Sequence, residues 1–363
     1  MGGASDTDGA ESGSARPGGG TADAPDRYDA VVVGGGPAGA AAGVFLARYG
    51  LEAAVFDRGN SSLARCAFLE NYPGFPAGID VETFRGLLRD HAREAGCAVI
   101  DDLVESVERA ERTDDDTTGE AVEPRFLVTT QEGRAVRTRS VVAATRYGGE
   151  YLRPLDGDAM FETHEHGDES HEIFDRDYAD ADGRTPVEGL YVASPSGQRD
   201  VQAAVAAGRG AHVARSMLED RRAVEGLPPE LAKHYDWLRP DSEFEGDWDE
   251  RDRWREWFDA RVPEDCDTDE DRLADLRERY VDRAFETRRS AAEVERLTER
   301  AHRRLAEALD DDALVAALDA EAVAGALDPD AVVDGLGDEA VLDAVDDDRI
   351  REYLGRAEST DDD

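Results

Sequence analysis

The sequence predicts an α/β fold, in which a parallel β-sheet with helices on both sides and a small antiparallel sheet precedes an all-α C-terminal region. Three observations lead to this prediction. An unbroken apolar run at residues 30–33 is followed by glycines at positions 34, 36 and 39, a spacing with which a strand turns tightly into a helix. Further short apolar runs recur up to residue 193, with helical patterns between them. Beyond residue 266, apolar side chains keep helical spacing.

The composition limits the classes of protein to which this chain can belong. Its 85 acidic residues outnumber 42 basic ones, its formal net charge is −43, and Lys233 is its single lysine. Such a charge repels nucleic acid and anionic membrane surfaces, so we expect neither as a partner. The acidic composition of every segment is typical of a protein dissolved in concentrated salt, and we expect a halophile's cytoplasmic protein. The N-terminus lacks the basic and apolar regions of a signal peptide, and no apolar run approaches the roughly 20 residues that span a bilayer.

The glycine-rich turn stands in the context of a nucleotide-binding unit. A helix is predicted at residues 38–48, and Pro37 suits its first turn. A second strand is predicted at 52–56, and it ends at Asp57, which is placed to accept hydrogen bonds from an adenosine ribose. Strand, glycines, helix, strand and acid follow in the order of a dinucleotide site; the alternative is a glycine-rich loop without a ligand.

Each glycine of the turn has its own task in such a site. Gly34 makes the sharp bend, and Gly39 lets the new helix pack closely on its strand. Gly36 leaves room for a pyrophosphate to approach the backbone. The free N–H groups and the dipole of the helix N-terminus then attract the phosphates.

The remaining elements of the first two thirds follow from apolar periodicity and turn residues. A leader at residues 1–26 has almost nothing to bury and is expected to be disordered. Residues 27–220 are predicted to form the nucleotide-binding domain. Its further elements are a long loop at 58–80, a helix at 81–95, a strand at 99–107, two strands at 125–130 and 134–144 around a hairpin turn at 131–133, an irregular loop at 146–186, a strand at 189–193, and an alanine-rich helix at 201–218 whose small residues face the element on which it packs.

The last third of the chain is predicted to add helices. Residues 221–266 hold all four tryptophans and form an aromatic-rich extension, which either packs against the first domain or offers a surface to a partner. Residues 267–357 are predicted to be helical, beginning with a long helix at 267–308. From Leu309 on, a leucine or valine recurs every nine residues, most often followed by an aspartate, which indicates short Asp-capped helices. Such helices must stack, as a helical cap or as a module that forms a homodimer. Residues 358–363 are an acidic tail.

Four segments, taken in order, resemble a known family. They read VVVGGGPAGAAAG at 31–43, LENYPGFPAGI at 69–79, VVAAT at 141–145, and TPVEGLYVAS with VQAAVAAGRGAHVA between 185 and 214. This arrangement resembles the flavin domain of the thioredoxin-reductase-like pyridine nucleotide-disulfide oxidoreductases, and the resemblance covers residues 28–220. It implies a Rossmann-like domain that binds FAD, in an oxidoreductase that transfers electrons through the flavin.

The resemblance also implies where the cofactor lies. Asn71 would lie near the flavin end, Val104 near the adenine and Thr145 near the middle of the cofactor. The helix that opens with Gln202 and Ala203 would direct its N-terminus at the side of the isoalloxazine where negative charge collects on reduction. Together with the glycine turn, the cofactor-binding residues that the resemblance implies are Gly34, Gly36, Pro37, Ala38, Gly39, Asp57, Arg58, Asn71, Val104, Ala144, Thr145, Gln202 and Ala203.

The chain departs from this family at three places. The family's Ala-Thr-Gly has Arg146 in place of the glycine, and its late Gly-Asp is replaced by Ser194 and Pro195. The second nucleotide domain, which holds NADPH and the CxxC dithiol, is expected to be absent, because residues 146–186 are too few for a domain of about 100 residues. NAD(P)H then has no dedicated domain, and a protein electron donor or acceptor, or transiently bound NAD(P)H, would exchange electrons with the flavin. The alternative is a non-catalytic FAD- or nucleotide-binding scaffold that recruits a partner through the helical C-terminal region.

Cysteines and histidines provide further candidate residues. Cys66 lies in the loop expected to run beside the flavin, where its thiolate could form a charge-transfer pair, as a catalytic residue; the alternative is a small buried side chain. Cys97 is expected in the core. His164, His166 and His171 lie among carboxylates, but their spacing matches no standard metal site, and we predict no metal there.

Overall fold

The computed structural model describes residues 26–59, 61–111, 124–146, 148–166, 169–194, 202–233 and 237–317. The predicted leader up to residue 25, the acidic tail and all but the first of the nine-residue repeats lie outside this part of the chain. The chain divides into two compact units, residues 1–293 and residues 294–363, and the whole nucleotide-binding domain belongs to the first.

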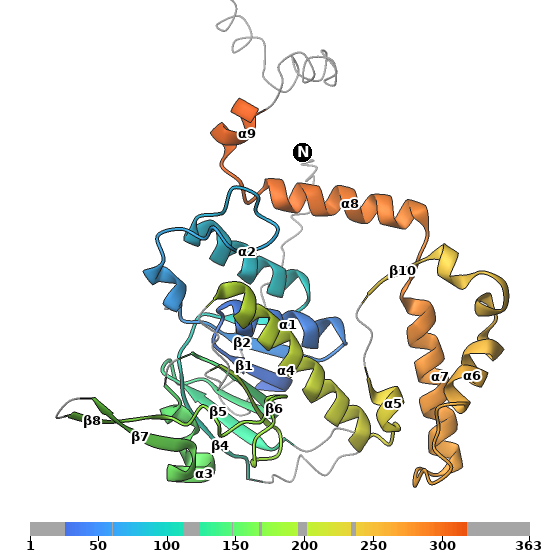
Figure 1. The fold of residues 1–363 in the computed structure, drawn as a ribbon, viewed down its shortest axis with the longest axis horizontal. Helices are drawn as coiled ribbons and strands as arrows, with labels where there is room; N and C mark the ends of the chain where they lie inside the picture. The colour runs from blue at the N-terminus through green and yellow to red at the C-terminus, as the bar shows by residue number, and fades with distance from the viewer. Residues whose placement is uncertain are drawn as a thin grey trace, which may run out of the picture. The chain divides into compact units, whose positions relative to one another are not determined.

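A parallel sheet carries the glycine turn (Figure 1). Its strands are β1 (Asp26–Val33), β2 (Ala53–Phe56), β3 (Ala98–Ile100), β6 (Ala135–Ala144) and β9 (Leu190–Ser194). They lie in the order β3-β2-β1-β6, and β9 pairs with the C-terminal half of β6, all in parallel. Helix α1 (Pro37–Arg48) connects β1 to β2. Strands β2 and β9 are buried along their whole length, as expected for parallel strands that are covered on both faces.

The antiparallel part of the same seven-stranded sheet consists of β4 (Val104–Arg109), β5 (Phe126–Thr130) and the N-terminal half of β6. The hairpin turn predicted at residues 131–133 joins β5 to β6 and is confirmed. The single strand predicted at 99–107 is wrong, because this segment forms two strands, β3 and β4, which lie at opposite ends of the strand order. Asp102 breaks the run, since its carboxylate accepts hydrogen bonds from the backbone N–H groups of Leu103 (2.7 Å) and Glu132 (3.3 Å).

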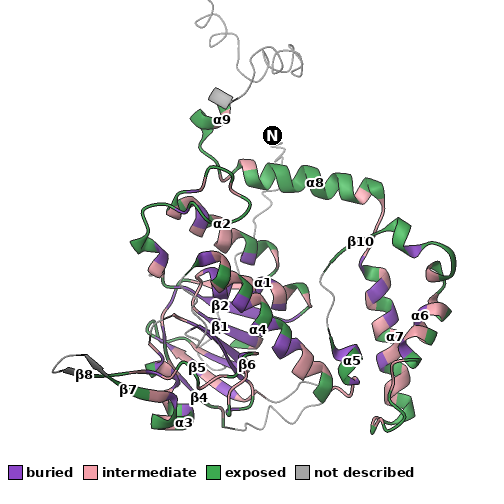
Figure 2. Cartoon of the chain, in the orientation of Figure 1, coloured by how far each residue is buried: buried purple, intermediate pink, exposed green. Residues whose placement is uncertain are grey.

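Two layers cover the faces of the parallel sheet. Helices α1, α2 (Val81–Glu94) and α4 (Ala203–Val224) pack on one face through a cluster of small and aliphatic side chains. The antiparallel strands and the short helix α3 (Arg153–Asp156) pack on the other face. In Figure 2 the buried residues concentrate in these strands and in helices α1 and α4. The predicted α/β fold class is therefore confirmed.

Helices α1 and α4 approach each other most closely at Gly210. A Cβ atom on this residue would lie 1.9 Å from the carbonyl oxygen of Ala38, so only glycine fits. The prediction that the small residues of this helix face the element on which it packs is thereby confirmed. The helix runs to Val224, beyond the predicted end at residue 218, because Arg221 pairs with Asp29 of β1 at 2.8 Å and holds the added turns against the sheet.

The segment predicted as an irregular loop, residues 146–186, is partly regular, which corrects the prediction. It contains η3 (Glu150–Leu152), α3, η4 (Gly157–Met160) and a hairpin of β7 (Phe161–His166) and β8 (Glu169–Phe174). The segment is fixed by a few widely spaced apolar residues that are buried, namely Leu152, Leu155, Met160 and Phe174. In the hairpin, His164 and His171 are cross-strand partners. The described residues contain no group of three or more His, Cys, Asp or Glu side chains placed to hold a metal ion.

The aromatic-rich extension packs against the helix that follows it. After α4 the chain forms α5 (Pro229–Ala232), β10 (Arg239–Pro240), η5 (Asp241–Phe244), η6 (Gly246–Asp249), α6 (Arg251–Asp259), α7 (Glu270–Glu286) and β11 (Arg288–Arg289), which pairs with β10. Phe244 and Trp254 form a cluster with Val281 of α7. A second cluster joins α5, α6 and α7 through Leu231, Phe258 and Leu276. Trp237, in contrast, is exposed.

The long helix predicted at 267–308 is interrupted, so this prediction is wrong. Helix α7 ends at Glu286 and α8 (Ala291–Ala306) begins five residues later, because Ser290 and Glu293 start a new helix by exchanging backbone-to-side-chain hydrogen bonds of 2.8 and 3.3 Å. Helix α9 (Asp311–Ala317) is the first of the predicted repeats, and Asp310 caps it by accepting a 2.8 Å hydrogen bond from the N–H of Ala313, as predicted. Among the helices of the described residues, none combines the length and the apolar character needed to cross a membrane.

Candidate dinucleotide-binding site

Of the three glycines of the predicted fingerprint between β1 and α1, two are required by the chain itself. Gly34 has φ +108°, and a Cβ atom there would lie 2.4 Å from the carbonyl oxygen of Ala144. A Cβ atom on Gly39 would lie 1.7 Å from the carbonyl oxygen of Gly34. The bend and the close packing of helix on strand, which the sequence predicted for these two positions, are present in the structure.

Gly36 differs from these two glycines, because nothing in the described chain requires it. Its φ of −70° suits any residue, and the atom nearest to an added Cβ would be Oγ of Ser61 at 3.5 Å, an ordinary contact distance. Gly36 is the N-cap residue of α1 and makes no side-chain cap, while Pro37 and Ala38 in the first turn are buried. Gly36 therefore offers no side chain to the first N–H groups of α1, and no described atom crowds the position of its missing Cβ, which is the geometry of an anion site at a helix N-terminus.

Asp57 lies directly beside this turn. It is 6% exposed, and a Cβ atom on Gly35 would lie 2.3 Å from the Cβ atom of Asp57. Oδ1 of Asp57 accepts a 3.0 Å hydrogen bond from the N–H of Gly59, and Oδ2 lies 3.7 Å from Nη1 of Arg89. The carboxylate is thus held at the end of β2 and keeps acceptor capacity on Oδ2 for a hydroxyl donor.

Two arginines of α2 support this corner, and the sequence analysis missed both. Arg89 bridges Asp57 to Asp101, and Arg85 donates a hydrogen bond to the carbonyl oxygen of Gly59. Their spacing of four residues puts them on one side of the helix, which was the signal present in the sequence. They hold the loop after β2 and place positive charge beside Asp57.

Asn71 and Gln202 come together although 131 residues separate them. Nδ2 of Asn71 donates a 2.7 Å hydrogen bond to Oε1 of Gln202. Gln202 is the N-cap residue of α4 and makes no side-chain cap, since its side-chain oxygen is engaged by Asn71. Ala203 is buried in a cluster with Leu63 and Phe84 beneath the loop after β2. The structure thus gathers the residues expected at the flavin end, and leaves the N–H groups at the start of α4 uncapped by Gln202.

Residues 144–146 border the turn from the side of β6. The carbonyl oxygen of Ala144 lies close to Gly34, 2.4 Å from where a Cβ atom would be. The N–H of Thr145 donates a 3.0 Å hydrogen bond to the carbonyl oxygen of Ser194. Arg146 has φ +62° and is the non-glycine residue with a positive φ among the described residues. The backbone therefore keeps at this position a conformation that favours glycine, although the side chain is an arginine.

The Arg146 side chain connects the end of β6 to the loop after β2. Its Nη1 donates a 2.7 Å hydrogen bond to Oγ of Ser62, which follows β2, whereas Arg146 follows β6. Strand β1 lies between β2 and β6. Oγ of Ser61, the residue before Ser62, is the atom nearest to a Cβ added at Gly36. We infer that the guanidinium lies over the glycine turn, at the carboxyl edge of the sheet where nucleotides bind in such folds.

Three further predicted residues differ in how far the fold buries them. Val104 has its side chain buried in the core, so it can offer a ligand only its backbone. Arg58 is exposed. Cys66 is exposed at the end of η1 (Ser62–Arg65), so the alternative of a small buried side chain is wrong. Cys97 is buried as predicted, and burial raises the pKa of its thiol to about 11. Pro195 lies outside the described residues.

Comparison with known proteins agrees with this geometry. A family described as an NAD(P)-binding Rossmann-like domain matches residues 32–94. Over 79 residues, the chain is 32% identical to thioredoxin reductase from Aquifex aeolicus (strain VF5), which is 21% of this chain and 24% of the relative. The chain therefore matches about a quarter of the length of this curated relative.

Solved structures of thioredoxin reductases also match the chain. The enzyme from Gloeobacter violaceus gives a TM-score of 0.42 at 18% identity and covers 59% of this chain and 98% of its own. The thioredoxin reductase from Giardia duodenalis gives 0.40 at 15% identity, with 55% and 100% covered. Residues 32–94 thus match an NAD(P)-binding Rossmann-like domain, and the chain shows distant similarity to thioredoxin reductases, as the sequence resemblance predicted.

Proposed function

We propose that this protein binds FAD at the glycine turn and transfers electrons through it, as a thioredoxin-reductase-like oxidoreductase that uses no CxxC dithiol. The observation that carries this proposal is the open backbone at Gly36. The chain needs Gly34 and Gly39 for its own packing, but Gly36 leaves a space that no described side chain fills. A glycine that the fold does not require, at a helix N-terminus beside a buried carboxylate, is explained by a pyrophosphate that approaches the backbone.

The residues present fit such a cofactor. The N-terminus of α1 would hold the pyrophosphate, and Arg146 would neutralise part of its charge. Asp57 would accept the hydrogen bonds of the ribose through Oδ2. The joined side chains of Asn71 and Gln202 would position the flavin end, with the start of α4 beside it. When bound, FAD would accept two electrons and release them to an acceptor.

The electron donor follows from the same geometry. The one glycine fingerprint of this type is assigned to FAD, so NAD(P)H would bind weakly and reduce the protein slowly. A partner protein is the faster donor or acceptor in this proposal. The acidic composition supports a cytoplasmic protein that works in concentrated salt.

The test is the visible absorption spectrum of the full chain purified in molar KCl and incubated with FAD, with two matched glycine variants. Gly36→Val puts a side chain where the pyrophosphate must approach, and we expect it to lose the flavin band while its unfolding temperature stays that of the flavin-free parent. Gly86→Val is the control, because nothing lies within 4 Å of a Cβ atom at this helical glycine of α2. A Gly36→Val protein with as much flavin as the parent would contradict the site, and a parent that retains no flavin would contradict the cofactor.

A non-catalytic scaffold is the second candidate, favoured by Arg146 and Ser194 in place of the family's residues. In that case FAD or another nucleotide would stabilise the fold, and the helical C-terminal region would recruit a partner. Dithionite reduction followed by air separates the two functions, together with a trial of protein donors and NADPH. A bound flavin that no donor reduces supports the scaffold, and fast oxidation of NADPH by the purified chain contradicts the absence of a nicotinamide site.

A further inference from the structure

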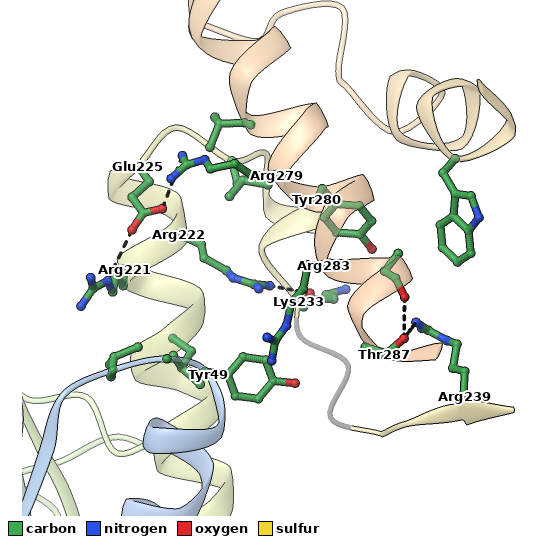
Figure 3. A pocket seen from close by; sticks show the side chains of 17 residues that line it. Tyr49, Arg221, Arg222, Glu225, Lys233, Arg239, Arg279, Tyr280, Arg283 and Thr287 are labelled. Carbon is green, nitrogen blue, oxygen red and sulfur yellow. Dashed lines mark hydrogen bonds and ion pairs between the residues drawn. The ribbon is translucent and has the colours of Figure 1, made fainter. Parts of the chain in front are cut away.

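A pocket lies in the same compact unit as the glycine turn but away from it (Figure 3). It is a cavity of about 280 Å³ between the residues after α1, the C-terminal part of α4 and the C-terminal part of α7. Tyr49 follows the last residue of α1, whereas the glycine turn precedes its first residue. Since α1 has 12 residues, about 18 Å of helix separates the two sites. A ligand here cannot be part of the cofactor site.

The charge of this pocket is opposite to that of the chain. Acidic residues outnumber basic ones about two to one in the sequence, but one acidic residue, Glu225, lines the pocket against six basic ones. The single lysine of the chain is one of them. The six basic residues are Arg221, Arg222, Lys233, Arg239, Arg279 and Arg283.

Three of these cations are tied to partners at the rim. Arg221 pairs with Asp29 at 2.8 Å, and Arg279 lies 3.9 Å from Glu225. Arg239 donates a 3.0 Å hydrogen bond to Oγ1 of Thr287. These three arginines therefore have a structural role in the packing around α4 and α7. Glu225, the one carboxylate that lines the pocket, is already paired with Arg279.

The other three cations converge on the centre. In Figure 3, Arg222 extends from α4 toward Lys233 and Arg283. Arg222 donates two hydrogen bonds of 3.4 Å, to the carbonyl oxygens of Ala232 and Lys233, and forms no ion pair with the described residues. Burial lowers the pKa of Arg222; Tyr49, Tyr280 and Glu225 raise it, and the charge of Arg283 lowers it. Nη1 of Arg283 lies 3.4 Å from Oε2 of Glu286, which is outside the pocket lining, and Nη2 donates a 2.9 Å hydrogen bond to the carbonyl oxygen of Arg48. With six basic residues and one carboxylate in its lining, the pocket still has an excess of positive charge, which an anion would stabilise.

Aromatic and apolar side chains complete the pocket. The guanidinium of Arg283 lies over the ring of Tyr49, 5.0 Å from its centroid, and Tyr280 lines the opposite wall. Leu51 and Leu276 add apolar surface. The cavity volume of about 280 Å³ lies just below the range of about 300–1,000 Å³ for ligand sites, so a mononucleotide-sized molecule fits better than a dinucleotide.

We propose that this pocket binds a small, multiply charged anion that carries a flat ring, of the mononucleotide class. The phosphate lies among Arg222, Lys233 and Arg283, and the ring lies between the two tyrosines. Because the pocket is remote from the glycine turn, such a ligand acts on the protein as an effector and not as a second redox group.

The first test measures binding of AMP, inorganic phosphate and adenosine by calorimetry to the full chain in fixed KCl, with Gly36→Val introduced to remove binding at the glycine turn. We expect AMP to bind at one site, more tightly than phosphate, and adenosine not to bind. Lys233→Gln should raise the Kd for AMP at least tenfold. Arg255→Gln is the charge-matched control, because Arg255 pairs with Glu278 on the surface of α6 and lies outside the pocket. Equal affinity for phosphate and AMP would contradict the proposal that the pocket binds the ring of the ligand. Equal affinity for AMP in the Lys233 and Arg255 variants would contradict the location of the site.

The second test uses the single lysine. Acylation of Lys233 by an amine-reactive reagent, followed by peptide mass spectrometry, reports on this pocket alone, and the α-amino group of the chain provides an internal reference. AMP should slow the reaction of Lys233 at least tenfold and leave the reference unchanged. Lys233 is exposed, so these readouts do not depend on the folding of a variant at the more buried Arg222. The absence of both protection and saturable binding would overturn the proposal.

Discussion

Two substitutions at Arg146 distinguish the effect of the backbone conformation at the proposed cofactor site from the effect of the guanidinium charge. Arg146→Ala and Arg146→Gly both remove the guanidinium and its 2.7 Å hydrogen bond to Ser62. They differ in the backbone, since φ is +62° at this position and a left-handed conformation costs a non-glycine residue about 1–2 kcal/mol. Glycine avoids this strain but gains unfolded-state entropy worth about 0.5–1 kcal/mol. We therefore expect Arg146→Gly to be more stable than Arg146→Ala by up to about 1 kcal/mol.

The assay is thermal unfolding of both proteins without flavin, in molar KCl, followed by circular dichroism. For a unit of this size, about 1 kcal/mol corresponds to an unfolding temperature roughly 2 °C higher for the glycine variant. The same pair of substitutions at Arg65, a 3₁₀-helical position without a positive φ, is the control, and there alanine should be the more stable residue. A glycine variant at 146 that melts at or below the alanine variant would refute the left-handed conformation.

The same two variants test the charge. If the guanidinium contacts the pyrophosphate, both should bind FAD about tenfold more weakly or worse, because a hydrogen bond to a charged group contributes about 1.5–3 kcal/mol. Reconstitution of the flavin-free protein with FAD, followed by flavin fluorescence, measures this. Tighter binding by both variants would show that Arg146 occupies the place of the anion, and would favour the scaffold over the enzyme.

Three further predictions concern the thiol, the salt dependence and a helix cap. A thiolate of the exposed Cys66 beside the isoalloxazine should give a long-wavelength charge-transfer band in the flavin spectrum, which Cys66→Ser should lose; a band that persists in the variant would exclude this thiol. Dilution from molar to about 0.1 M KCl should lower the unfolding temperature, because a charge of −43 is less screened, and an unfolding temperature indifferent to salt would contradict the halophile prediction. Asp80 caps α2 by accepting a 2.8 Å hydrogen bond from the N–H of Thr83, which lowers the pKa of its carboxyl, so Asp80→Ala should cost about 1 kcal/mol at pH 7. Because the folded pKa lies below the unfolded value, this difference should be complete above about pH 4 and should shrink as the pH falls through the folded pKa; a difference independent of pH would contradict the cap.

Local features of the sequence were sufficient to predict the core of the fold. The run of valines before Gly34 and the short strand before Asp57 gave the nucleotide-binding unit, because strand, turn and helix are encoded within about 30 residues there. The break at Asp102 was missed, since a polar pair inside an apolar run looks the same whether the strand continues or a second strand begins elsewhere in the sheet. The hairpin of β7 and β8 was missed because its strands are mostly polar, and the apolar residues that anchor the segment are too far apart to show a period.

Contacts between distant segments could not be predicted from periodicity. The hydrogen bond between Asn71 and Gln202 was accessible through resemblance alone, because nothing in either segment refers to the other. In the sequence, Arg146 is visible only as a departure from a motif. The positive φ, and with it the backbone strain, is known from the structure. The basic pocket was hidden altogether, since Arg222, Lys233 and Arg283 belong to three segments of an acidic chain.

The net charge connects the two anion sites that we propose for this protein. At molar salt the screening length is about 3 Å, so the chain's many carboxylates act on a ligand only when they touch it, and direct contacts decide whether an anion binds. Each site meets this condition in its own way: the glycine turn offers backbone N–H groups with Arg146 above them, and the pocket between α4 and α7 offers three converging cations. At low salt, where screening reaches about 30 Å, the same local cations would have to outweigh the repulsion of the whole surface. A chain this acidic can therefore keep anionic ligands only where basic groups are concentrated, which is why the position of its single lysine in such a pocket is informative.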